Sequence, residues 1–374
     1  MIKKHERVRK GWMRRTSRIY ITNTVNKGKI ESLIRFLNQY QNAINYCVQR
    51  FWSNKDFTDE LATKEITDAI GERFGFTARL SQCVAKQSKE MVNSQREKSR
   101  KERRIPRMKH RVANLDSRFV TIENFDGHFD MCLKFTSGVP QIVMPFNWTG
   151  HTDKFRNNGW ELAKSIRLGY NENGLFVDLI FEKERPPKRT EGKLIGIDRG
   201  YNCMLHTSDG QKIGKELKPK IKSVDKRRKT YHHYIETEEN RLLKKLNLDD
   251  VKIVVLESLK YVKMNKRGKF PRNTNRLLSF WHYAKVGNRL AQICEELGVS
   301  EELKNPYKTS QRCPDCGNID RRNRRGERFL CLSCGYADDA DHVGAKNLEL
   351  LGLAGVYSLR SLPSDFMEVR NERL

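Results

Sequence analysis

The chain has 374 residues and carries 73 Lys and Arg against 46 Asp and Glu, a formal net charge of +27. Its length predicts two or three domains, and its 37% hydrophobic content excludes a mostly disordered chain. The excess positive charge favours a polyanionic partner, above all nucleic acid. No apolar run approaches the about 20 residues that a membrane-spanning helix requires, and the charged residues 1–6 do not resemble a secretory signal. We therefore expect no membrane partner and a reducing location in the cytosol or nucleus.

The excess charge divides the chain into three regions. Residues 1–111 hold 27 basic and 11 acidic residues, residues 112–190 hold 10 of each, and residues 191–374 hold 36 and 25. Two basic regions therefore flank a neutral one, which favours two nucleic-acid contact surfaces separated by a scaffold.

The first basic region begins with a predicted strand at 17–24, where residues alternate and are β-branched, and three helices follow. Apolar residues at three- and four-residue steps predict the helix 27–52, and similar patterns predict helices at 60–74 and 78–104. Residues 96–111 contain nine Lys and Arg and two Glu. We expect this stretch to contact phosphates, and a solvated helix end is the alternative. The residues expected to make these contacts are Arg100, Lys101, Arg103 and Arg104.

Short β segments separated by turn signals characterise the neutral region. Dipeptides such as Asp126-Gly127 and Asn173-Gly174 are typical of hairpin turns. The pattern predicts a small antiparallel barrel or sandwich, followed by a linker at 186–189. The predicted strands are 119–122, 132–135, 141–144, 165–168 and 175–181.

Strands and helices mix in the second basic region. Residues 193–198 and 251–256 are apolar strands, and a basic helical stretch at 215–246 separates them. A long helix is predicted at 275–297, and the weakly periodic end of the chain at 357–374 is expected to be disordered. The basic residues of the helical stretch that we expect to contact nucleic acid are Arg227 and Arg228.

Two C-x-x-C pairs are separated by 14 residues, and a glycine follows each pair. Each pair lets two thiolates reach one ion from a tight turn, so the two pairs predict one structural zinc in a closed tetrahedral ribbon. A redox function would need only one pair, and iron–sulfur clusters usually have a different spacing. Arg321 and Arg322 lie between the pairs and are candidate nucleic-acid contacts. The predicted zinc ligands are Cys313, Cys316, Cys331 and Cys334.

Acidic residues end both apolar strands of this region. Asp198 and Glu257 are the two strand-end acids, and a third acidic group at 338–341 precedes an apolar helix. Acids from separate elements that converge at one sheet edge can hold two Mg²⁺ ions about 4 Å apart, which suits phosphodiester hydrolysis. One strand-end acid alone usually means a cap or a turn, so the prediction depends on the combination.

The motifs occur in an order that resembles the TnpB family. They are G-I-D-R-G at 196–200, V-V-L-E-S-L at 254–259, T-S-Q at 309–311 before the first cysteine pair, and D-H-V-G-A-K-N at 341–347. The family consists of transposon-encoded, RNA-guided DNA endonucleases with a split RuvC-like nuclease domain, related to compact type V CRISPR effectors. The match covers the C-terminal half directly and the N-terminal half more loosely.

Roles for the acids follow from this resemblance. It implies that Asp198, Glu257 and Asp341 are the catalytic acids and the Mg²⁺ ligands. Asp338 and Asp339 are the competing third acids, and helix capping is their alternative role.

The sequence departs from the family pattern in two ways. Val343 and Gly344 replace the usual Asn-Ala after the third acid, which affects the expected metal geometry. The 59-residue interval between Asp198 and Glu257 is also short for the family.

The resemblance implies a multidomain α+β fold. An RNase H-like (RuvC) α/β nuclease domain would carry the zinc ribbon, and a β-barrel wedge domain would carry an inserted α-helical recognition domain. The expected segments are a wedge strand (1–26), the recognition domain (27–111), the wedge barrel (112–190), a first nuclease segment (191–308), the zinc ribbon (309–336), a second nuclease segment (337–356) and a tail (357–374).

The implied function is an RNA-guided, Mg²⁺-dependent DNA endonuclease that cuts beside a short target-adjacent motif and supports transposon maintenance. Its partners would be a guide RNA from the transposon end and double-stranded target DNA, in the cytoplasm and nucleoid of a prokaryote. The cofactors would be one structural Zn²⁺ and two catalytic Mg²⁺, and the pattern is compatible with a monomer or a dimer. The alternatives are an RNA-guided DNA-binding regulator, a compact CRISPR type V effector and a guide-independent strand-transfer enzyme.

Overall fold

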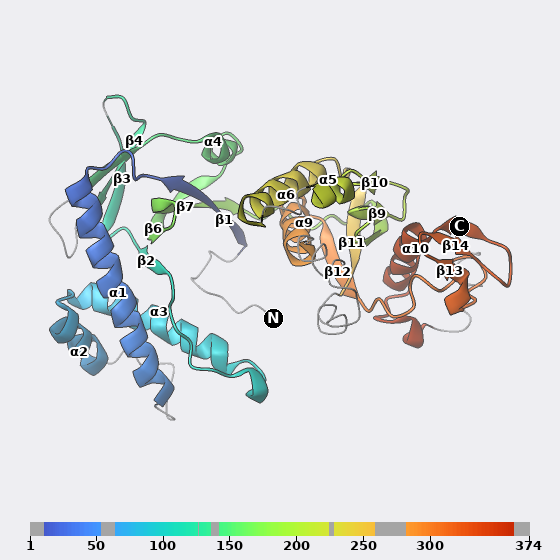
Figure 1. Cartoon of the computed structure of the whole chain (residues 1–374), viewed down its shortest axis with the longest axis horizontal. Helices are drawn as coiled ribbons and strands as arrows, with labels where there is room; N and C mark the ends of the chain where they lie inside the picture. Colours follow the sequence, from blue (N-terminus) through green and yellow to red (C-terminus); the bar gives the residue numbers. More distant parts are fainter. Residues whose placement is uncertain are drawn as a thin grey trace. The chain divides into compact units, whose positions relative to one another are not determined.

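The computed structural model describes residues 11–53, 64–125, 127–135, 142–223, 228–258 and 282–362 (Figure 1). The chain divides into two compact units, Met1–Glu184 and Arg185–Leu374. Both units mix helices with strands, which confirms the predicted mixed α/β content. No helix in the described part of the chain is long and apolar enough to cross a membrane.

Three helices and two antiparallel sheets build the first unit. The long helix α1 (Lys27–Ser53) buries a stripe of apolar side chains, as its spacing predicts, and α2 (Lys64–Phe74) and α3 (Ala78–Arg96) pack beside it. The predicted helix 60–74 is confirmed from Lys64 onward, and its first four residues lie outside the described residues.

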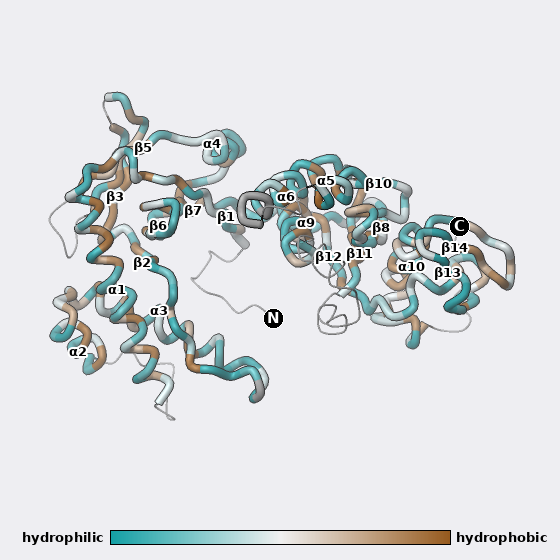
Figure 2. Tube along the Cα trace, viewed as in Figure 1, coloured by the Kyte–Doolittle hydropathy of each residue, from teal (hydrophilic) through white to brown (hydrophobic). Residues whose placement is uncertain are grey.

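The end of α3 differs from the prediction of a helix over 78–104. The helix ends at Arg96, because no apolar residue occurs between Val92 and Ile105 that could hold a further turn against the core. The following segment contains a single 3-10 turn, η1 (Arg100–Glu102), and Figure 2 shows that it is hydrophilic.

The strands of the first unit form a four-stranded sheet in the order β1-β7-β6-β2 and a three-stranded sheet in the order β3-β4-β5. The first strand covers Trp12–Tyr20 instead of the predicted 17–24. The sequence pattern misses the start of this strand because the charged residues Arg14 and Arg15 are untypical of strands. Arg14 is accommodated there by an ion pair with Glu182, its cross-strand partner on β7. The remaining elements are β2 (Arg111–Leu115), β3 (Val120–Asn124), β4 (Met131–Phe135), β5 (Ile142–Phe146), α4 (Gly150–Arg156), β6 (Glu161–Asn171) and β7 (Gly174–Glu184).

One apolar core joins the helices of the first unit to both sheets. The ring centroid of Phe36 on α1 lies 5.0 Å from that of Phe135 on β4, and both side chains are buried. The helical and strand segments that were predicted as separate domains therefore share a single core.

A five-stranded mixed sheet forms the centre of the second unit, in the order β10-β9-β8-β11-β12. The strands β8, β9 and β10 are antiparallel neighbours, whereas β11 runs parallel to β8 and β12 runs parallel to β11. The predicted strands at 193–198 and 251–256 are confirmed as β8 and β11. The bounds are β8 (Lys193–Asp198), β9 (Leu205–Thr207), β10 (Lys212–Ile213), β11 (Val251–Glu257) and β12 (Ser300–Lys304).

Helices and a small third sheet complete the second unit. The helix predicted at 275–297 is described as α9 (Tyr283–Leu297), and residues 275–281 lie outside the described residues. The basic stretch forms α5 (Leu217–Ser223) and α6 (Arg228–Leu243), and α10 (Ala340–Leu353) packs on β8. The small sheet comprises β13 (Arg324–Arg325), β14 (Arg328–Leu330) and β15 (Ala337–Asp339), after the 3-10 turn η2 (Arg321–Asn323).

The expectation of a disordered tail is wrong for residues 357–362. They contain the 3-10 turn η3 (Leu359–Ser361), and Leu359 is buried against Leu350 and Leu351 of α10. Residues 363–374 lie outside the described residues.

Candidate active site and metal centre

Two of the predicted acids lie at the same edge of the central sheet. Asp198 is the last residue of β8, and Glu257 is the last residue of β11. The two strands are parallel, with Ile197 opposite Leu256, so their terminal acids are neighbours. The structure thus places both acids where the strand pattern predicts them, and their catalytic role stays a prediction.

The third predicted acid, Asp341, reaches this edge from the first turn of α10. A β-carbon on Gly344 of α10 would lie 3.0 Å from Oδ2 of Asp198, so the Asp198 carboxylate faces α10. A β-carbon on Gly200, in the turn after β8, would lie 3.1 Å from Oδ2 of Asp341. Each carboxylate therefore lies against the element that carries the other. The sequence departure at Gly344 leaves open the space next to Asp198.

Burial and neighbouring charges together set the electrostatics of this cluster. Burial raises the pKa of Asp198 well above its usual range, and the neighbouring carboxylates of Glu257 and Asp341 raise it further. Burial also raises the pKa of Asp341, while Arg324 acts in the opposite direction. Acids with raised pKa values on one sheet edge are typical of a site that binds cations or exchanges protons.

The spacing of the acids differs from that of the cysteines. Among the residues that the structure describes, only the four cysteines bring three or more ligand atoms within 4.8 Å of one another. Asp198, Glu257 and Asp341 therefore do not form a ligand group as close as that of the cysteines.

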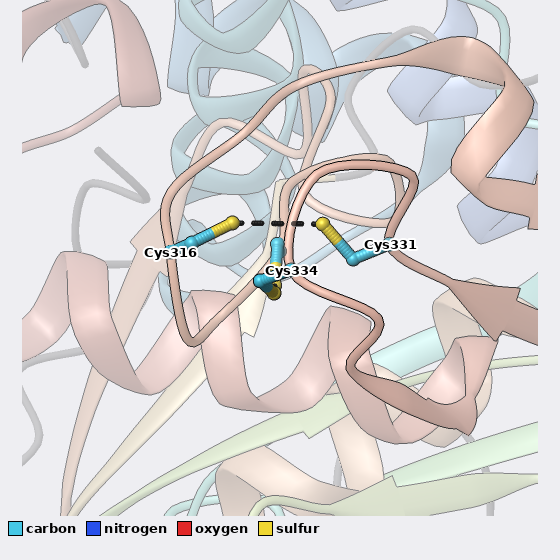
Figure 3. A group of neighbouring side chains, drawn as sticks. Cys316, Cys331 and Cys334 are labelled. Carbon is cyan, nitrogen blue, oxygen red and sulfur yellow. Dashed lines mark hydrogen bonds between the residues drawn. The ribbon is translucent and has the colours of Figure 1, made fainter.

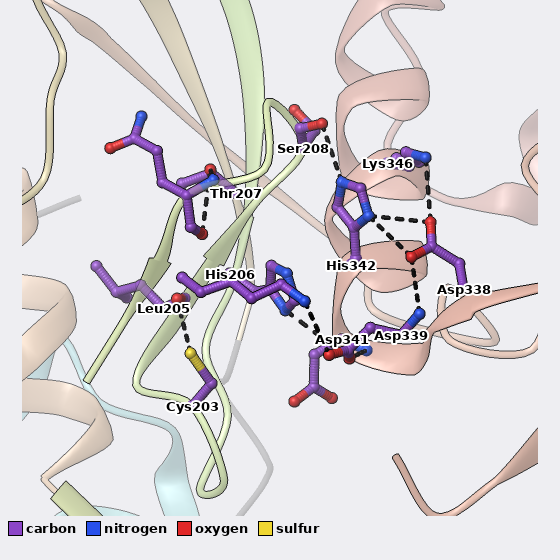
Figure 4. A network of polar contacts seen from close by, with 12 residues as sticks. Cys203, Leu205, His206, Thr207, Ser208, Asp338, Asp339, Asp341, His342 and Lys346 are labelled. Atoms are coloured by element: carbon purple, nitrogen blue, oxygen red, sulfur yellow. Dashed lines mark hydrogen bonds and ion pairs between the residues drawn. The ribbon is translucent and has the colours of Figure 1, made fainter. Parts of the chain in front are cut away.

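Asp338 and Asp339, the competing third acids, form hydrogen bonds with groups outside the pair Asp198 and Glu257 (Figure 4). Burial would raise the pKa of Asp338, but hydrogen bonds from Tyr336 and His342 hold it well below its usual value. Oδ1 of Asp339 accepts a hydrogen bond of 3.0 Å from the backbone N–H of Asp341, which makes Asp339 the N-cap of α10. Asp339 thus adopts the predicted capping role, and Asp341 remains the acid that faces Asp198.

Two arginines contact the acid cluster. Arg199 is buried and donates from Nη2 to the backbone oxygen of Glu257 at 2.6 Å. Arg324 donates from Nη2 to Oδ1 of Asp341 at 3.2 Å. Neither contact was predicted, although the position of Arg199 directly after Asp198 was a usable signal in the sequence.

The four predicted zinc ligands converge in the second unit. Figure 3 shows three of them, Cys316, Cys331 and Cys334. The sulfur atoms of Cys313 and Cys334 are 3.6 Å apart, and those of Cys316 and Cys331 are 3.5 Å apart. A tetrahedral zinc with Zn–S bonds of about 2.3 Å has sulfur–sulfur edges of about 3.8 Å, so the cluster fits a zinc ion.

The two cysteine turns repeat one backbone geometry. Gly317 and Gly335, which follow the pairs, have φ values of 76° and 75°, in the left-handed region that favours glycine. Their backbone N–H groups donate to the carbonyls of Cys313 and Cys331 at 3.1 and 3.0 Å. Glycine at these two positions therefore lets each cysteine turn close without backbone strain.

Five of the eight side chains predicted to contact nucleic acid are exposed, and the other three lie outside the described residues. Arg100, Arg103 and Arg104 are exposed after α3, and Arg321 and Arg322 are exposed in η2. Arg322 forms an ion pair with Asp320 at 2.7 Å. The side chains of Lys101, Arg227 and Arg228 lie outside the described residues.

A basic groove of about 1130 Å³ in the first unit was not predicted. The antiparallel sheet contributes aromatic and basic side chains, and the segment after α3 contributes further cations. Arg18 lies with its guanidinium carbon 3.7 Å from the centroid of the Phe176 ring and forms hydrogen bonds with buried Asp178 at 2.6 and 2.9 Å. The cationic residues that line the groove are Arg18, Arg107, Lys109, Arg111 and Arg167.

The sequence signal for some of this groove was already present, because three of its cations belong to the basic stretch 96–111. Arg18 and Arg167 could not be found in this way, since they come from strands that are distant in sequence and meet only through β7.

Comparison with known proteins agrees with these features. Residues 283–348, which include α9, the cysteine ribbon and the start of α10, match the family model "Cas12f1-like, TNB domain". A CRISPR-associated endodeoxyribonuclease Cas12f1 of Sulfoacidibacillus thermotolerans is 39% identical over 77 residues, which are 20% of this chain and 18% of that protein. A TnpB-like protein of Aquifex aeolicus is 32% identical over 105 residues, which are 27% of this chain and 34% of that protein.

The fold is similar to a solved Cas12f1 structure, determined as a complex with a single-guide RNA and target DNA. The TM-score is 0.55 at 12% identity, over 87% of this chain and 83% of that one. These matches confirm the predicted resemblance to the TnpB and compact type V proteins. The chain matches about half or less of the length of its curated relatives.

Proposed function

We propose that the protein is an RNA-guided, Mg²⁺-dependent DNA endonuclease with an RNase H-like (RuvC) nuclease domain. The observation that carries the proposal is the convergence of Asp198, Glu257 and Asp341 from three separate elements at one sheet edge. The sheet order, with the first two acids on adjacent central parallel strands, supports this assignment. The names of the Cas12f1 relatives and the fold similarity support RNA guidance and DNA as the target.

The acids would hold the divalent ions. Carboxylates suit Mg²⁺, which is a hard cation. Burial and the neighbouring carboxylates of Glu257 and Asp341 raise the pKa of Asp198, and a bound cation would favour its ionised form. When bound, the metal ions would activate a water molecule and stabilise the leaving oxygen of a phosphodiester. Arg199 holds the end of β11 through the backbone oxygen of Glu257, and so fixes one ligand relative to the other.

The four cysteines would hold one structural zinc. All four ligand positions of a tetrahedral zinc would be filled, so the ion would stabilise the ribbon and not take part in the reaction. The exposed arginines of η2 and the segment after α3 would contact phosphates, as would the basic groove of the first unit. We also propose that the chain is divided into the recognition, wedge and nuclease segments predicted from the sequence.

A cleavage assay tests the proposal. Protein purified with its RNA is incubated with DNA that matches the guide, in the presence of Mg²⁺, and with DNA that does not match it. We expect the matched DNA to be cut, Asp198→Asn to abolish cutting, and Asp250→Asn to cut normally, because Asp250 is a solvent-exposed acid outside the site. Undiminished cutting by Asp198→Asn would refute the role of that acid. Binding without any cutting by the wild type would favour the DNA-binding regulator.

The compact CRISPR type V effector is the second candidate. The match to the Cas12f1-like TNB domain and the 39% identity to a Cas12f1 protein favour it. Sequencing of the copurified RNA distinguishes a transposon-linked protein from a CRISPR-linked one. A guide that continues from a transposon end supports transposon maintenance, whereas a guide joined to a CRISPR repeat supports the effector.

A further inference from the structure

Asn347 is a completely buried polar residue on α10 that the proposed reaction does not use. Its side-chain amide lies within hydrogen-bonding distance of three backbone oxygens, those of Thr309 at 2.8 Å, Arg312 at 2.9 Å and Val343 at 3.0 Å. Its carbonyl oxygen accepts a hydrogen bond of 3.0 Å from Nη1 of Arg312. Both polar atoms of this side chain therefore have partners, as a buried amide requires.

Arg312 extends this network to the cysteine cluster. Its side chain is buried, and the same Nη1 donates to the backbone oxygen of Cys313 at 3.1 Å. The backbone of Arg312 also bridges to Ile319, on the far side of the first cysteine turn. Asn347 is thus connected to a predicted zinc ligand through one side chain.

The ribbon and the start of α10 also share an apolar core. Ala340 and Val343 of α10 are buried in one cluster with Cys313, Phe329 and Cys331 of the ribbon. This placement explains the departure at Val343, because an apolar side chain suits a position that faces the ribbon core. The first turn of α10 therefore packs against the cysteine site on one side and carries Asp341 on the other.

Further contacts tie the same helical turn to the ribbon. The backbone N–H of Ala340 donates to the oxygen of Glu327 at 2.9 Å, and β15, which leads into α10, pairs with β14. The ribbon thus holds α10 before, at and after the position of Asp341. Asn347 and Arg312 provide the contact after it.

We propose that Asn347 and Arg312 are positioning residues that couple the four-cysteine site to Asp341. A filled cysteine site fixes the first cysteine turn, Arg312 and Asn347 transmit that position to α10, and α10 holds Asp341 at the sheet edge. The inference rests on the proposed function for the role of Asp341, but the coupling itself is a property of the fold. It predicts that zinc in the ribbon governs the order of the first turn of α10.

The test uses the full chain with Asn347→Leu, which is similar in size and removes every side-chain hydrogen bond of Asn347. Leu353→Ala is the matched control, since Leu353 lies on the same helix and is exposed. Three quantities are measured in each protein: zinc per chain, hydrogen exchange of the amides at 340–344, and the Mg²⁺ concentration that gives half-maximal cleavage.

We expect Asn347→Leu to keep about one zinc per chain, with faster exchange at 340–344 and a Mg²⁺ requirement raised by about ten-fold, as for other residues that orient metal ligands. Leu353→Ala should match the wild type in all three. A variant that keeps zinc and shows wild-type exchange and a wild-type Mg²⁺ requirement would overturn the coupling.

A second experiment keeps the proposal testable if Asn347→Leu does not fold. Zinc is removed from the wild-type protein with a chelator, and exchange at 340–344 is compared before and after removal. We expect exchange to rise on removal and to recover when zinc is added back, and unchanged exchange would overturn the coupling. This comparison needs no cleavage, so it stays decisive even if the wild type cuts no DNA.

Discussion

Gly196 of β8 and Ala345 of α10 are in such close backbone contact that a β-carbon on Gly196 would lie 2.0 Å from the Ala345 carbonyl oxygen. The same β-carbon would lie 2.6 Å from the backbone nitrogen of Glu349. The helix that carries the third acid can therefore approach the strand that carries the first only because residue 196 has no side chain.

Gly196→Ala should consequently destabilise the second unit. The backbone atoms of Ala345 and Glu349 cannot move aside as a flexible side chain can. We therefore expect the free energy of unfolding to fall by about 1–3 kcal/mol. Denaturant unfolding of the variant and the wild type measures this loss. Gly28→Ala is the control, because a β-carbon on Gly28 meets nothing within 4 Å. Equal stability of both variants would contradict the close packing.

Divalent ions should stabilise the folded protein through the acid cluster. At a Mg²⁺ concentration 100 times the dissociation constant, binding at one site adds about 2.7 kcal/mol. We expect Asp198→Asn to be more stable than the wild type without Mg²⁺, since it removes a carboxyl group whose ionised form is disfavoured by burial and by two neighbouring carboxylates, and to gain less when Mg²⁺ is added. Thermal unfolding with and without Mg²⁺ measures both effects. An equal gain in both proteins would mean that the ions bind elsewhere.

His206 should make stability depend on pH. Burial lowers the pKa of this histidine from 6.5 to about 4, and its ring stacks on His342 with centroids 5.2 Å apart. The unfolded chain therefore binds more protons than the folded chain between pH 6.5 and 4. The stabilisation associated with neutral His206 is fully present above pH 6.5. The free energy of unfolding falls with decreasing pH between 6.5 and 4, by up to about 1.4 kcal/mol per pH unit.

Variants of two histidines isolate this effect in denaturant unfolding from pH 7.5 to 4.5. His206→Gln should flatten the dependence, because it removes the titrating ring. His233→Gln changes an exposed histidine and should leave the dependence as in the wild type. A similar slope in both variants would contradict the assignment to His206.

The cysteine cluster should contain about one zinc per chain by metal analysis. Replacement of the buried ligand Cys331 by Ala should remove the ion and lower the melting temperature. Cys294→Ala is the control, since Cys294 is buried outside the cluster, and it should keep the zinc. Zinc-free wild-type protein that is fully active would refute the four-cysteine site.

The basic groove of the first unit should contribute to nucleic-acid binding mainly through charge. Replacing both Arg107 and Lys109 by Gln should weaken binding and reduce the slope of log affinity against log salt by roughly 0.7–0.9 for each phosphate that the variant no longer neutralises. Filter binding at several salt concentrations measures the slope. Lys27→Gln, an exposed lysine outside the groove, is the control, and an unchanged slope in the double variant would exclude groove contacts with phosphate.

Local patterns in the sequence were sufficient for several elements. The spacing of apolar residues predicts α1 to within one residue, and the two C-x-x-C pairs predict the cysteine cluster, because both depend on neighbours in the chain. The order of motifs also predicted the resemblance to the TnpB family, which the comparisons confirm. The short β9 and β10 and the charged edge strand β12 escaped prediction, because only pairing with neighbouring strands defines them.

The arrangement of the site depends on tertiary packing that one sequence does not display. The capping bond of Asp339 and the approach of α10 to β8 favour Asp341 over Asp339 as the third acid of the proposed site. The contacts of Arg199 and Arg324 with the acid-bearing segments, and the assembly of the basic groove from distant strands, follow from the same packing.

The position of Asp341 on α10 has a consequence for biosynthesis. Asp198 and Glu257 leave the ribosome well before α10 does, and the helix must then pack on β8 before the third carboxylate is in place. A nascent or prematurely terminated polypeptide would therefore carry the basic groove without a complete acid cluster. Under the proposed function, such a product would bind nucleic acid without cutting it.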